Sequence, residues 1–129
     1  MTEERTSKYP LLFYSAAALN LGIGAVFICL PATAYQLMTG TTPPDSPAIV
    51  WMFGMVVIIF GLGYAWAGRD FEANRAVVKL AAIGKAAAFI VGAGAYFAGH
   101  MTLPAFGGAT MDLIYAMLFA RTLGWWGRP

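Results

Sequence analysis

The chain has 129 residues, of which 60% are apolar and 11% are charged, and its mean hydropathy is +0.68. A water-soluble domain needs roughly a quarter of its residues charged, so this composition excludes that class. The net charge of +2 is too small, and the basic residues are too scattered, to indicate nucleic-acid binding. The single cysteine, Cys29, excludes an internal disulfide, a CxxC redox pair and a cysteine-based zinc site within one chain.

The first apolar stretch is long enough to cross a bilayer. It begins at Pro10, where a helix start tolerates proline, and ends at Pro31, where a helix is expected to stop. The small residues at 32–34 also suit a signal-peptide cleavage site. The apolar run exceeds a usual signal core, and Glu3 and Glu4 dilute the positive start, so we interpret the stretch as a membrane helix.

Three further apolar stretches follow. Residues 32–47 are rich in Thr and Pro and are predicted to form a loop. A hydrated link is expected at 68–76, and a short link containing Pro104 at 100–108. The sequence therefore predicts one all-α domain over 1–129, an integral membrane four-helix bundle with helices at about 10–31, 48–67, 77–99 and 109–126.

Basic residues flank only one set of helix ends. Seven of them lie at the N-terminus, in or beside the link at 68–76, and at the C-terminus, and the other two links carry none. The positive-inside rule therefore predicts that both termini and the 68–76 link are cytoplasmic. The seven residues are Arg5, Lys8, Arg69, Arg75, Lys79, Arg121 and Arg128.

The third predicted helix is rich in small residues. Gly84, Ala88 and Gly92 recur every four residues, which lets neighbouring backbones approach closely. We therefore expect this helix to be central in the bundle.

Lys85, Asp112 and Asn20 are polar residues at membrane depth. A charged side chain near the bilayer centre costs about 2.5–3.5 kcal/mol on insertion scales, so each needs a partner or water. We hypothesise a polar column of Asp112, Asn20 and Lys85, joined by water or by one of Tyr14, Tyr64, Tyr96 and Tyr115. A hairpin centred near residue 104 would place Lys85 and Asp112 roughly 15 Å apart in depth, so a direct ion pair is not expected.

Each of these residues also has a plainer interpretation. Lys85 can extend to the cytoplasmic headgroups or contact another subunit. Asp112 can cap the first turn of its helix. Asn20 can serve only to hold helices together, and Arg121 only as an interfacial anchor.

His100 is the sole histidine and lies at the outer end of the third predicted helix. A haem with two histidine ligands, a metal triad and a Ser-His-Asp triad each need further residues that this chain does not offer beside its one histidine. His100 is either a polar interface residue or one axial ligand to a pigment or haem shared with a partner chain. No cofactor is predicted for the chain alone, and no phosphate-binding or hydrolase motif is present.

Several short elements resemble those of small, uncharacterised bacterial four-helix membrane proteins, loosely DoxX-like. The resemblance covers about two thirds of the chain, and it departs from DoxX proteins proper, which usually carry the Gly-Lys pair in helix one. It implies a four-helix protein of the bacterial inner membrane. The elements are Phe53-Gly54 through Gly61, Gly63 and Tyr64, then Arg69-Asp70, Gly84-Lys85, Asp112-Leu113 and Phe119.

The missing catalytic set favours a non-catalytic membrane protein. We expect an accessory subunit of a larger complex or a binder of a hydrophobic ligand, with membrane lipids and other subunits or further copies as partners. The alternative is a small oligomeric transporter or proton-coupled carrier that uses Lys85 and Asp112. A third class, an enzyme on lipid or quinone substrates, would use Asp112 as acid or base.

Overall fold

The computed structural model describes residues 8–128, and within them the fold is all-α. Four helices, α1, α3, α4 and α5, are long and apolar enough to cross a bilayer, so the chain is a multi-pass membrane protein. The fifth, α2, is short. The bounds are α1 Pro10–Cys29, α2 Pro31–Thr39, α3 Ala48–Arg69, α4 Arg75–Phe97 and α5 Leu103–Thr122.

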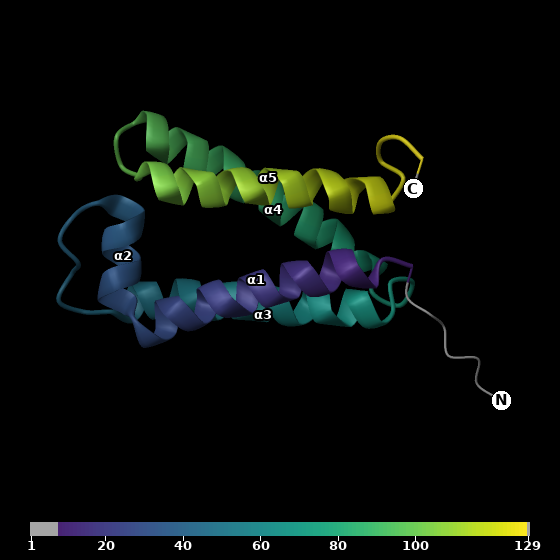
Figure 1. Ribbon diagram of the computed structural model, residues 1–129, viewed down its shortest axis with the longest axis horizontal. Helices are drawn as coiled ribbons and strands as arrows, with labels where there is room; N and C mark the ends of the chain where they lie inside the picture. The colour runs from purple at the N-terminus through teal and green to yellow at the C-terminus, as the bar shows by residue number, and fades with distance from the viewer. Residues whose placement is uncertain (1–7, 129) are drawn as a thin grey trace.

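The four long helices form two antiparallel pairs, α1 with α3 and α4 with α5 (Figure 1). The link at 70–74 joins the pairs, and contact between α3 and α4 is sparse compared with contact within each pair. Away from the link the pairs diverge, and α2 lies between them at the opposite end (Figure 1). There the Thr102 amide donates to the Met38 carbonyl at 2.9 Å, which ties the start of α5 to α2.

The prediction of a loop over residues 32–47 is wrong for its first part, which forms α2. Pro31 ends the first span as expected, but it also occupies the first turn of α2, where its missing N–H costs nothing. Gly40 ends α2 with φ 69°, a left-handed conformation that favours glycine. One proline therefore separates two helices.

The last helix begins at Leu103, six residues before the predicted start at 109. The Thr102 side chain caps it by accepting a hydrogen bond from the Ala105 amide. Pro104 falls in the first turn, where proline is tolerated, so it starts the helix and does not lie in a loop. This shift changes the register of the whole α4–α5 hairpin.

The expectation that the helix at 77–99 is central is also wrong, because α4 packs mainly on α5. It approaches α5 closely at Gly92, where an added Cβ would lie 2.7 Å from the Ala109 Cβ. Comparable close approaches bring α1 and α3 together. A Cβ on Gly24 would lie 2.9 Å from the Gly54 carbonyl oxygen, and one on Gly54 would lie 2.8 Å from the Phe27 Cβ.

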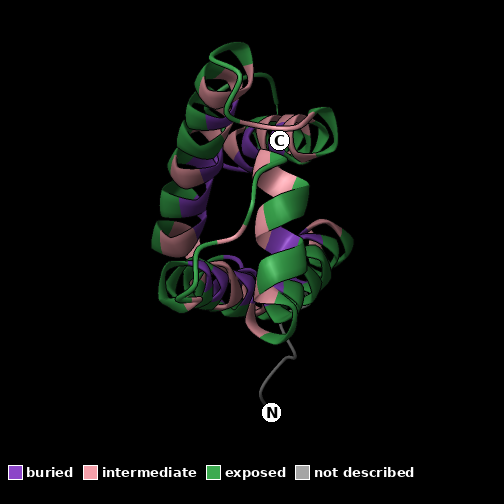
Figure 2. Ribbon diagram, turned by 90° about the vertical axis from the view of Figure 1, so that its left-hand side faces the viewer, coloured by how far each residue is buried: buried purple, intermediate pink, exposed green. Residues whose placement is uncertain are grey.

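The main apolar core lies in the half of the molecule nearest the 70–74 link. Phe13 of α1, Val78 of α4 and Phe119 of α5 are fully buried there. The Phe13 and Phe119 rings stack with centroids 4.9 Å apart, and this contact joins the two pairs. Figure 2 shows the buried residues on the sides of the helices that face one another.

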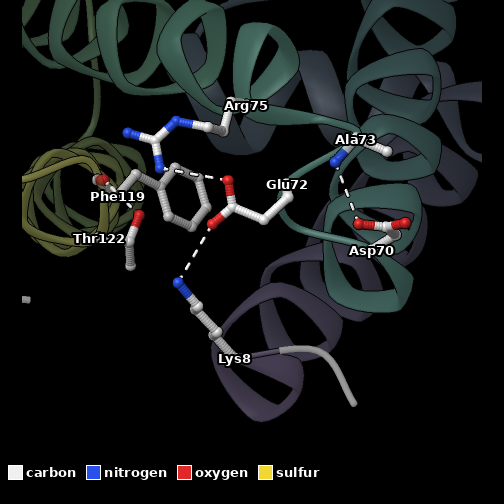
Figure 3. Close-up of polar contacts among 7 residues, drawn as sticks. All are labelled: Lys8, Asp70, Glu72, Ala73, Arg75, Phe119 and Thr122. Carbon is white, nitrogen blue, oxygen red and sulfur yellow. Dashed lines mark hydrogen bonds and ion pairs between the residues drawn. The ribbon is translucent and has the colours of Figure 1, made fainter. Parts of the chain in front are cut away.

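The link end of the molecule also gathers the basic residues. The start of α1, the link and the end of α5 lie at this end (Figure 1). Figure 3 shows Lys8 and Arg75 pointing toward Glu72, at N···O distances of 3.2 and 3.7 Å. The described basic residues outside the bilayer centre therefore share one end of the bundle, whereas Arg5 lies outside the described residues.

Substitution of Gly24 tests the close approach of α1 and α3. Because the new methyl group would meet the Gly54 carbonyl and Ile58, we expect Gly24→Ala to lower the free energy of unfolding by about 1–3 kcal/mol. Gly22→Ala is the matched control, since no heavy atom of another element lies within 4 Å of its Cβ. Thermal unfolding in detergent should separate the two variants, and equal stability would contradict the packing.

Candidate functional site

The central feature of the site is an ion pair between α4 and α5. Lys85 Nζ lies 2.6 Å from Asp112 Oδ1. Lys85 is the eleventh of 23 residues in α4, and Asp112 is the tenth of 20 in α5, so both lie near mid-span. The Lys85 side chain is only 6% exposed, whereas that of Asp112 is 33% exposed.

The expectation that Lys85 and Asp112 do not form a direct ion pair is wrong. It assumed a turn centred near residue 104, but with α5 starting at Leu103 the turn centres near residue 100. Lys85 is then level with about residue 115 of α5, three residues from Asp112, or roughly 4.5 Å along the axis. The long lysine stem covers that offset.

Two of the plainer interpretations do not fit this geometry. Lys85 does not extend to the headgroups, because its ammonium is buried against Asp112. Asp112 does not cap a helix start, because α5 has no acidic residue in its first turn.

Asn20 connects the ion pair to the other helix pair. Its Oδ1 accepts a hydrogen bond from Lys85 Nζ at 3.4 Å, and its Nδ2 donates to the Val57 carbonyl of α3 at 3.2 Å. The structure therefore brings together the three residues of the hypothesised column, Lys85, Asp112 and Asn20. The amide also binds α1 to α3, so its role as interhelical glue holds alongside its contact with Lys85.

Two tyrosine rings enclose the ammonium. Lys85 Nζ lies 5.3 Å from the Tyr64 ring centroid and 5.5 Å from that of Tyr115, distances at which an aromatic face attracts a cation. All four spanning helices thus contribute to the site.

Ser15 is a site residue that the sequence analysis missed. Its hydroxyl lies 3.0 Å from the Tyr115 hydroxyl and forms a hydrogen bond between α1 and α5. Its position five residues before Asn20 in an apolar helix is the signal that could have found it. Of the four tyrosines considered for the polar column, the remaining two lie away from the site: Tyr14 packs against Gly68, and Tyr96 stacks on Phe106.

The structure does not bring His100 to this site. It is exposed at the α4–α5 turn, fifteen residues from Lys85, or roughly 22 Å along a helix axis. Residues 8–128 contain no group of three His, Cys, Asp or Glu side chains that could hold a metal. Arg121 is exposed at the end of α5, with its guanidinium 5.5 Å from the Trp126 ring.

The two charges of the pair have unequal hydrogen bonding. Lys85 donates to both Asp112 and Asn20 and is enclosed by aromatic rings. For Asp112, the described part of the chain supplies one hydrogen-bond partner, Lys85, through Oδ1. Chemically, the carboxylate retains acceptor capacity for a polar group that comes from outside the described chain.

Comparison with protein families, curated proteins and solved structures finds no match to this chain. No family match therefore supports the DoxX-like resemblance. The sequence and the fold together define a small membrane protein with four spanning helices.

Removing one charge tests the ion pair. We expect Asp112→Leu to lower the free energy of unfolding by about 3–5 kcal/mol, because it leaves the enclosed Lys85 without a counter-charge. Lys85→Met should cost less, since the Asp112 side chain, at 33% exposed, is less enclosed than that of Lys85, at 6%. The double variant should recover most of the loss, measured by unfolding in mixed micelles; additive losses would contradict the pairing.

Proposed function

We propose that this protein is a non-catalytic, membrane-embedded binder of a hydrophobic molecule whose polar head hydrogen-bonds to Asp112. The observation that carries the proposal is the asymmetry of the ion pair. Lys85 is 6% exposed and its ammonium is enclosed, whereas a third of the Asp112 side chain is open at the middle of a spanning helix.

An open carboxylate at mid-span is costly in hydrocarbon, at about 2.5–3.5 kcal/mol on insertion scales. An ion pair that served only to join α4 and α5 would be most stable with both charges enclosed and hydrogen-bonded. A polar group that covers the free side of Asp112 removes this cost. The binding energy of such a ligand would therefore come largely from hydrogen bonding to the carboxylate.

The acceptor chemistry of Asp112 defines the class of ligand. A carboxylate accepts hydrogen bonds, so the head group must donate them, as a hydroxyl, an amide or an amine does. The rest of the molecule must be apolar, because the surrounding spans are apolar over their full length.

The test is extraction and mass spectrometry of small molecules retained by the protein purified in mild detergent. We expect a hydrophobic hydrogen-bond donor near one equivalent per chain, and at least about tenfold less in Asp112→Asn, because the amide loses the charge-assisted bond. The asparagine keeps an acceptor for Lys85, and a thermal unfolding measurement checks that the variant folds.

Asp45→Asn is the matched control, since it makes the same change in the connection between α2 and α3, away from the ion pair. Equal retention by both variants would contradict the proposal. Co-purification of a stoichiometric membrane protein in place of a small molecule would replace it with the accessory-subunit interpretation.

We also propose that the protein resides in the inner membrane of a bacterium with both termini and the 70–74 link facing the cytoplasm. Support comes from the positive-inside rule, because the flanking basic residues lie at one end of the spans.

A proton-coupled carrier is the second candidate, favoured by the position of the ion pair, which joins α4 to α5 and faces Asn20 of the other helix pair, where contact between the pairs is sparse. For this candidate we expect pH-dependent flux of a substrate in proteoliposomes that is lost in Lys85→Met. Flux at the level of the unmodified protein in that variant would exclude a role for Lys85.

A further inference from the structure

A groove between α1 and α5 lies outside the ion pair. Its volume is about 590 Å³, and its lining includes Leu11 and Leu12 of α1 and Ile114 and Leu118 of α5. The lining extends from Lys8, two residues before α1, to Ser15 on α1 and from Leu118 to Met111 on α5, roughly 10 Å along the helix axes. Because these helices are membrane spans, the groove runs in the direction of a lipid acyl chain.

The two ends of the groove differ in chemistry. At the end of the groove nearer mid-span, the Ser15 and Tyr115 hydroxyls hydrogen-bond to each other at 3.0 Å, so this end has little need of a polar ligand. At the end of the groove near the start of α1 lies Lys8, whose side chain is 64% exposed. The groove therefore combines an apolar trough with one cation at its mouth.

The charge around that mouth is positive beyond Lys8 itself. Glu72 lies within 4 Å of both Lys8 and Arg75, so these three side chains together carry one net positive charge (Figure 3). This end of the described chain carries six basic side chains and two acidic ones. The basic residues are Lys8, Arg69, Arg75, Lys79, Arg121 and Arg128, and the acidic residues are Asp70 and Glu72.

We infer that this groove binds an anionic phospholipid, with one acyl chain between α1 and α5 and the headgroup at Lys8. The site is distinct from the proposed ligand at Asp112, because its polar contact lies at the end of the span and recognises negative charge. It does not depend on what Asp112 binds.

The experiment is native mass spectrometry of the full chain released from nanodiscs that contain dioleoylphosphatidylglycerol or dioleoylphosphatidylcholine. The unmodified protein should retain the anionic lipid in preference to the zwitterionic one. In Lys8→Gln we expect retention of the anionic lipid to fall about fivefold, the effect of one cation near the membrane surface. Lys79→Gln makes the same change on an exposed residue outside the groove lining and should have a smaller effect.

Filling the groove gives a second, independent measurement. Ile114→Trp should displace the acyl chain and abolish retention of either lipid, whereas Ile90→Trp, on an exposed face of α4, should leave retention unchanged. Equal retention of the two lipids by the unmodified protein, equal loss in the two lysine variants, or full retention in Ile114→Trp would each overturn the inference. Retention of another protein chain that Ile114→Trp displaces would overturn it as well.

Discussion

The structure depends on the neutralisation of two charges that lie near the middle of membrane-spanning helices. Lys85 alone would be costly in hydrocarbon, and the same holds for Asp112. Their contact at 2.6 Å converts two unfavourable insertions into one cross-link between α4 and α5. Asn20 then extends the link to α1 and, through the Val57 carbonyl, to α3. A polar contact at mid-span therefore joins helix pairs whose apolar contact is concentrated at one end.

This arrangement places three different constraints along the molecule. The aromatic contact between Phe13 and Phe119 joins the pairs on the side of the link, and the polar site joins them near mid-span. At the opposite end, α2 lies between the pairs and accepts a hydrogen bond from the Thr102 amide. The pairs are thus connected at three levels, even though α4 makes little contact with α3. The polar site lies between the apolar core at the link end and the part of the molecule where the helix pairs diverge.

The unequal exposure of Lys85 and Asp112, which supports the proposed ligand at Asp112, also makes that site chemically different from the groove at Lys8. Lys85 is enclosed by tyrosine rings and donates its hydrogen bonds to groups within the protein. The accessible group of the ion pair is therefore an acceptor, the Asp112 carboxylate. The groove instead presents an exposed cation at the end of the spans. Tyr115 borders both, with its ring toward Lys85 and its hydroxyl bound to Ser15. The two proposed ligands therefore differ: one donates hydrogen bonds to a carboxylate, and the other carries negative charge.

The sequence by itself determined the all-α class and the four spans, because the length of an apolar run is set directly by bilayer thickness. It also singled out Lys85, Asp112 and Asn20, since polar residues at membrane depth are rare and costly. The sequence does not distinguish a proline in a loop from a proline at a helix start: it predicts loops after Pro31 and around Pro104, yet each proline occupies the first turn of a helix. Only the tertiary structure decided the register of α5 and therefore the ion pair, because a shift of a few residues in the turn moves facing side chains by twice that distance. The pairing of α1 with α3, and the place of Ser15 beside Tyr115, depend likewise on contacts between residues far apart in the chain, which local patterns do not encode.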